Sequence, residues 1–138
     1  MKTLKQITTI LILSIITLTS LNAQSLSKQQ ESKILNASAE ILINAAKPFY
    51  KKGMTEQEFI NSSLGNVKIK DRKASLLLHE IYSVASGNKT HFNTTILKDI
   101  ARSKKPIDEL IQPMDKKWNW KKFFKVLKLV IDIIVVFL

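Results

Sequence analysis

Residues 118–138 constrain the fold most, because they combine a very apolar stretch with regularly spaced lysines. On a helical wheel of about 100° per residue, one arc of roughly 120° holds all the charged residues: Lys121, Lys122, Lys125, Lys128 and Asp132. The same arc also holds Trp118, Leu129 and Val136. The rest of the wheel is apolar or aromatic: Trp120, Phe123, Phe124, Val126, Leu127, Val130, Ile131, Ile133, Ile134, Phe137 and Leu138. The pattern predicts a basic amphipathic helix that starts near Lys116 and is capped by Asp115.

A basic amphipathic helix with Trp and Phe near its start is typical of a membrane-surface segment. Lysines facing anionic headgroups contribute about 1 kcal/mol each at low salt, and Trp rings suit the interface. We therefore expect an anionic membrane surface as partner. The candidate membrane-binding residues are Trp118, Trp120, Lys121, Lys122, Phe123, Phe124, Lys125, Leu127, Lys128, Val130, Ile131 and Ile134.

This helix is too short and too charged to be a lone membrane span. The ten nearly apolar residues from Leu129 to Leu138 cover about 15 Å, half of a bilayer core. A span from Phe123 would bury two lysines and Asp132, at roughly 2.5 to 3.5 kcal/mol each near the centre. We expect an in-plane or oblique helix, or a homo-oligomer that shelters Asp132 in a pore.

Two other interpretations of the tail remain open. A very apolar helix is also what a small bundle uses as its central core element. The β-branched run from Val130 to Val136 also suits a buried strand. The coincidence of Trp118, Trp120 and six lysines with the apolar stretch favours the membrane interpretation, because a core helix needs no such cluster.

The first 23 residues have the layout of a secretory signal peptide. Lys2 and Lys5 precede an uncharged Ile- and Leu-rich run that ends at the small residue Ala23. We expect cleavage after Ala23 and export to the periplasm or the medium, with association with a membrane; an uncleaved N-terminal anchor is the alternative. The chain contains no cysteine, so its core must form without disulfides. Without Lys2 and Lys5, twenty basic residues face eleven acidic ones, a net charge of +9.

Between these ends the sequence is helical throughout. Capping boxes predict helix starts at Ser27 and Thr55. We expect the first of these helices to end near Pro48 and the second to end at Gly65. An apolar stripe from Ala74 to Ala85 precedes Gly87, and another helix starts near Asn93. A brief segment follows Pro106, and no strand pattern competes before Val126. The predicted fold is all-α, a small bundle of about four short helices over residues 24–113, followed by the helical tail over residues 114–138.

No residue pattern indicates an enzyme. His79 and His91 lie on different elements, without the spacing of a zinc helix, and His79 suits a structural role beside the apolar stripe. No nucleophile elbow, phosphate loop or paired carboxylate is present. We therefore expect no catalytic residue, metal or cofactor. Nucleic acid is a poor partner for an exported chain without a recognition motif.

The order of parts resembles exported peptide-toxin precursors of the sporulation-delaying type. The likeness in sequence lies in Ser86-Gly87-Asn88 and the helix around Ile96 to Ile100 that follows. The resemblance implies a membrane-permeabilising toxin released by processing. This tail departs from the family in being short and rich in lysine, without a cysteine pair or a long apolar hairpin.

Together these patterns predict an exported helical protein with a membrane-active, toxin-like or antimicrobial tail. The alternative is a non-catalytic structural or binding module whose hydrophobic tail is buried in its own core or docks on a partner.

Overall fold

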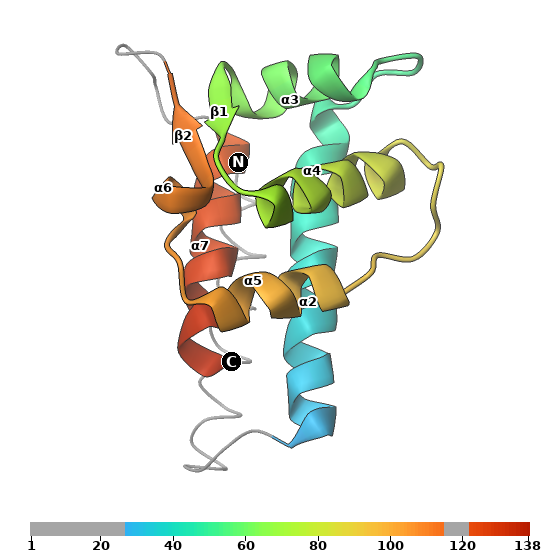
Figure 1. Ribbon diagram of the computed structural model, residues 1–138. Coiled ribbons are helices and arrows are strands. Elements are labelled where there is room, and N and C mark those ends of the chain that lie inside the picture. The colour runs from blue at the N-terminus through green and yellow to red at the C-terminus, as the bar shows by residue number, and fades with distance from the viewer. Residues whose placement is uncertain (1–26, 115–121) are drawn as a thin grey trace.

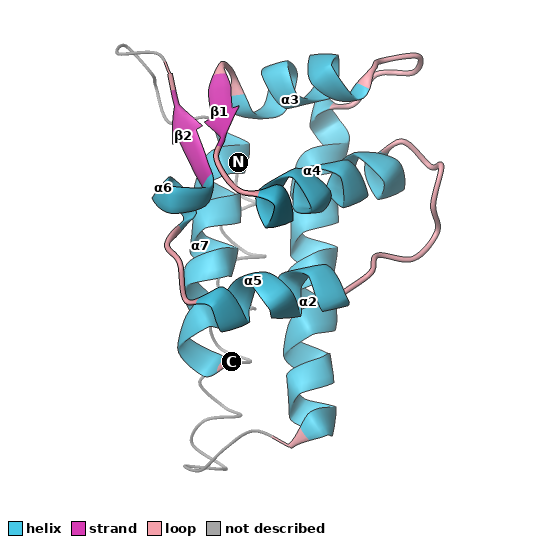
Figure 2. Ribbon diagram, viewed as in Figure 1, coloured by secondary structure: helices cyan, strands magenta, loops and turns pink. Residues whose placement is uncertain are grey.

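The computed structural model describes residues 27–114 and 122–138. This part of the chain is mostly helical, which confirms the expected all-α class (Figures 1 and 2). The elements in chain order are α2 (Lys28–Ala46), the 3-10 turn η1 (Lys47–Phe49), α3 (Glu56–Leu64), β1 (Val67–Ile69), α4 (Arg72–Ala85), α5 (Thr95–Ser103), α6 (Ile107–Leu110), β2 (Ile111–Pro113) and α7 (Lys122–Phe137).

Helix α2 begins and ends where the sequence predicts. The Ser27 side chain accepts from the backbone of Gln30, and the Gln30 side chain accepts from the backbone of Ser27. The helix gives way to η1 just before Pro48, which cannot continue an α-helical ladder. Leu42 and Ala46 are fully buried, and the burial of Ile41 and Ile43 on different sides makes α2 a central helix.

Helices α3 and α4 also follow their local signals. Thr55 and Glu58 form the expected reciprocal capping box of α3. Gly65 ends that helix at φ 80°, in the left-handed region that favours glycine. Helix α4 starts after Asp71, whose carboxylate accepts from the Lys73 backbone N–H. The Tyr82 hydroxyl of α4 donates to the carbonyl of Met54 at 2.7 Å, joining α4 to the segment that leads into α3.

A two-stranded antiparallel sheet corrects the expectation that no strand precedes Val126. Val67 pairs with Pro113, Lys68 with Gln112 and Ile69 with Ile111. Two further backbone bonds extend the ribbon, from Lys70 N–H to the Leu110 carbonyl and from Met114 N–H to the Asn66 carbonyl. Each strand has only three residues, too few for a period-2 pattern to stand out from the neighbouring helices.

Helix α7 completes the fold from the far end of the chain. It lies antiparallel beside α2, and α4 and α5 cross the pair on one face, with α3 near one end (Figure 1). Helices α2 and α5 make its most extensive contacts, followed by α3 and α6. One hydrophobic core therefore includes residues of α2 through α7.

Candidate functional site

The apolar candidates for membrane binding lie in the protein core. Phe123, Phe124, Leu127, Ile131 and Ile134 are 0% exposed and Val130 is 1% exposed. Val126, from the same arc of the wheel, is also buried. Along α7 the expected separation of polar and apolar arcs is therefore present, but these seven residues of the apolar arc face other helices and not a solvent-accessible surface.

Specific contacts fix α7 at both ends. Near its start, the ring of Phe123 lies 6.3 Å from the ring of Phe49, between centroids and at a tilt that suits aromatic pairs. Near its end, the Lys104 ammonium donates to the Val135 carbonyl at 2.8 Å. A cation at this end also interacts favourably with the helix dipole. Lys104 adopts a left-handed conformation (φ 56°) at the end of α5.

The charged candidates lie on the solvent-facing side of α7. Lys122, Lys125 and Asp132 are exposed, and Lys128 is half-buried. Val136 lies on the same stripe and is 75% exposed. The candidates Trp118, Trp120 and Lys121, and the expected helix start at Asp115 and Lys116, lie outside the described residues.

Among residues 27–114 and 122–138, no helix combines the length and the apolar character that crossing a bilayer requires.

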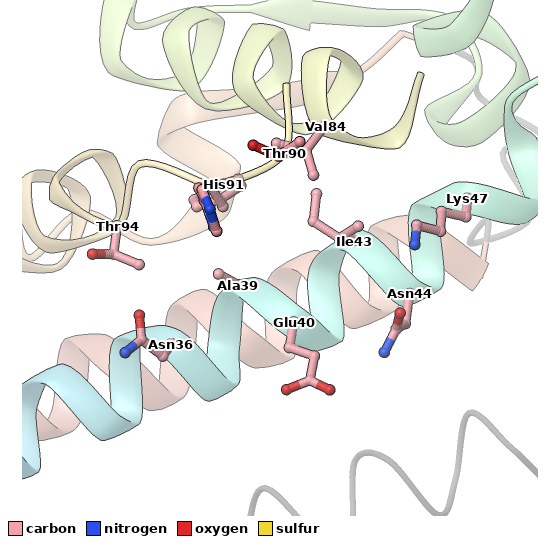
Figure 3. Close-up of a pocket in the computed structure, with 11 residues that line it drawn as sticks. Asn36, Ala39, Glu40, Ile43, Asn44, Lys47, Val84, Thr90, His91 and Thr94 are labelled. Carbon is pink, nitrogen blue, oxygen red and sulfur yellow. The ribbon is translucent and has the colours of Figure 1, made fainter. Parts of the chain in front are cut away.

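A second candidate site is an open hollow of about 330 Å³ between α2 and the loop that joins α4 to α5. In Figure 3, His91 and Thr94 of the loop face α2, Ile43 and Val84 point toward each other, and Glu40 points away from the loop. The other lining residues are Asn36, Ala39, Asn44, Lys47, Thr90 and Phe92. The lining mixes amide, hydroxyl, imidazole and apolar groups with one acid and one cation, so it favours no single class of ligand.

Glu80 holds the loop that forms this hollow. Glu80 is 5% exposed. Its carboxylate accepts hydrogen bonds from the Lys89 ammonium at 2.5 Å and from the Asn93 backbone N–H at 2.7 Å. A buried carboxylate needs such partners, because an unpaired one would be costly. The sequence did not predict that Glu80 holds this loop. The one indication in the sequence was that Glu80 is a charged residue next to the apolar stripe of α4.

The two histidines belong to no candidate metal centre in the described part of the chain. His79 is exposed and pairs with the Glu56 carboxylate at 2.5 Å, joining α4 to α3. One imidazole nitrogen of His79 therefore has a partner, and the pair lies at the surface. The described residues contain no group of three or more His, Cys, Asp or Glu that could hold a metal ion.

Comparison with protein-family models, curated proteins and solved structures finds no match to this chain. Export and the resemblance to sporulation-delaying precursors therefore stay predictions, and residues 1–26 lie outside the described part of the chain.

Proposed function

We propose that the protein is an exported, non-catalytic helical binding protein in which helix α7 is a structural part of the core. The observation that carries this proposal is the burial of seven residues on the apolar arc of α7: Phe123, Phe124, Val126, Leu127, Val130, Ile131 and Ile134. Between the two functions that the sequence leaves open, this burial supports the binding module with an internal tail.

The energetic argument concerns what membrane insertion of α7 would cost. Fully burying a Leu, Ile or Phe side chain contributes roughly 1.5 to 3 kcal/mol, and five such residues of α7 are 0% exposed. Withdrawing the helix would also expose the faces of α2 and α5 that it covers. A bilayer would have to compensate for both surfaces, so the folded state opposes insertion.

Removing α7 tests this proposal. A chain that ends at Gln112 is expected to lose cooperative thermal unfolding in circular dichroism, because α2 and α5 lose the helix that they contact most. The full-length protein should melt cooperatively. Cooperative melting of the shortened chain would contradict the proposal.

A second candidate function is membrane permeabilisation by α7 after it leaves the core. The exposed Lys122 and Lys125 on its outer stripe favour this function, because they could reach anionic headgroups first. Phe49→Ala removes the ring that contacts Phe123 and should loosen α7. If release is the function, leakage of anionic vesicles should increase in this variant. If α7 is only structural, the variant should lose stability without gaining leakage.

A further inference from the structure

A basic surface surrounds the junction of β1 and α4, outside the tail. Lys68, Lys70, Arg72 and Lys73 are all exposed within six consecutive residues. Because side chains alternate along a strand, Lys68 and Lys70 leave the same side of the ribbon, opposite the partly buried Val67 and Ile69. The β1–α4 surface is defined here as these four residues together with Lys105.

Lys105 joins this surface from the connection between α5 and α6. Its ammonium lies 3.2 Å from the Asp71 carboxylate and its side chain is 48% exposed. Asp71 also accepts from the Lys73 backbone N–H at 2.8 Å. The backbone hydrogen bond from Lys73 has the largest effect and the hydrogen bond from Lys105 the next largest. Together they hold the pKa of Asp71 below its usual value. Asp71 is thus one carboxylate among five cations.

The two exposed acids of α6, Asp108 and Glu109, are the other negative charges near Lys105 in the sequence. Even when both are counted, the five cations exceed the three acids by two charges. The surface therefore keeps a positive potential that would attract a polyanion.

The dipole of α4 does not favour these cations. Arg72 and Lys73 lie in the first turn of α4, which contains no acidic residue of its own and follows the N-cap Asp71. Cations at the N-terminal end of a helix oppose its dipole, by roughly 0.3 to 1 kcal/mol each when exposed. Residues that break a local rule in this way are expected at functional surfaces.

Exposed apolar side chains accompany the charges. Leu76 is 46% exposed and follows Arg72 by one helical turn, so both lie on the same face of α4. Met114 is 52% exposed. It follows Gln112 of β2 by two residues, and Gln112 is paired with Lys68 of β1. Leu76 and Met114 are two of the three exposed large hydrophobic residues among those described. Apolar groups among lysines suit a headgroup region better than nucleic acid, which is read mainly through charge and polar groups.

We propose that the β1–α4 surface binds the anionic headgroups of a lipid bilayer while helix α7 stays in the core. This inference rests on the proposed function, because it names the partner of the folded binding protein. It moves the membrane contact from the apolar arc of the tail to a surface that the fold creates.

Three variants of the full-length chain, each with four fewer positive charges, test this proposal by co-sedimentation with phosphatidylglycerol-containing and pure phosphatidylcholine vesicles. The surface variant carries K68Q, K70Q, R72Q and K73Q. The tail variant carries K121Q, K122Q, K125Q and K128Q. The control carries K28Q, K33Q, K51Q and K52Q, at positions exposed on α2 and before α3.

Each basic residue close to an anionic surface raises affinity about fivefold at low salt. The surface variant lacks four such residues and is therefore expected to bind anionic vesicles roughly 600-fold more weakly, while the control stays within a few-fold of wild type. Wild-type binding should fall as salt is added, because charges are screened over about 10 Å at 0.1 M, and should be weak on phosphatidylcholine. Circular dichroism of each variant checks that it is folded. L76S with M114S, which leaves the charge unchanged, should also weaken binding.

Three results would overturn the proposal. Equal losses in the surface variant and the control would show a response to net charge only. Loss in the tail variant alone would return the membrane contact to α7. A wild-type protein that binds heparin or DNA but no anionic vesicle would have another class of partner. None of these results changes the melting of the chain that ends at Gln112, which tests the proposed function separately.

Discussion

Replacing Leu127 by alanine should destabilise the protein strongly, and the same change at Leu129 should not. The two leucines are two residues apart on α7, but Leu127 is 0% exposed, whereas Leu129 is half-buried on the outer stripe. A Leu→Ala change in a core costs the transfer free energy of the side chain and leaves a cavity, about 3 to 5 kcal/mol together. At a half-buried position we expect about 1 kcal/mol.

Urea unfolding followed by circular dichroism measures both free energies of unfolding. For a domain of this size, about 3 kcal/mol corresponds to a fall in Tm of roughly 10 °C. The pair of variants has identical chemistry, so helix propensity cancels in the comparison. Equal and small losses of stability at the two positions would refute the burial of the apolar arc. Weaker vesicle binding by L127A, without a loss of stability, would place this arc against a membrane.

Four further predictions concern other parts of the chain. Ser38→Ala should raise the free energy of unfolding by about 1 kcal/mol in urea titration, because the fully buried Ser38 hydroxyl has no hydrogen-bond partner among the described residues. A lower free energy of unfolding would show that this hydroxyl does have a partner. Glu80→Gln should cost about 1.5 to 3 kcal/mol and speed amide exchange at Asn93, and unchanged exchange would show that another contact holds the loop. Since its pKa is lowered by folding, Asp71 should stabilise the protein above about pH 4 and lose this effect as pH falls through the lowered value. Asp71→Asn should therefore be less stable at pH 7 but equal to wild type in strong acid; a constant difference would contradict the linkage. Intact mass of the exported protein should show cleavage after Ala23; a product starting at Met1 would exclude it.

Local signals sufficed for much of the helical structure. Both capping boxes form as the sequence predicts, Gly65 ends α3 and the turn before Pro48 ends α2. These features depend on side chains within a few residues of each other, so they can be predicted without knowledge of the tertiary contacts. The same is true of the polar and apolar arcs of α7, which follow from helical spacing alone.

Long-range features could not be predicted in the same way. An apolar arc has the same pattern whether it faces a bilayer or a neighbouring helix, so spacing could not place Leu127. The pairing of Lys68 with Gln112 joins strands of three residues across 44 positions of sequence. The β1–α4 surface likewise depends on Lys105 reaching Asp71 from a different connection. These features are products of chain topology.

The pairing of α2 with α7 also has a consequence for timing during synthesis. About 75 residues separate the end of α2 at Ala46 from the start of α7 at Lys122. At roughly 5 to 20 residues per second, a ribosome needs on the order of 4 to 15 seconds to make them. During that interval α2 has emerged without the helix that covers one of its sides. A nascent chain in this state cannot close the core that α2 and α7 share.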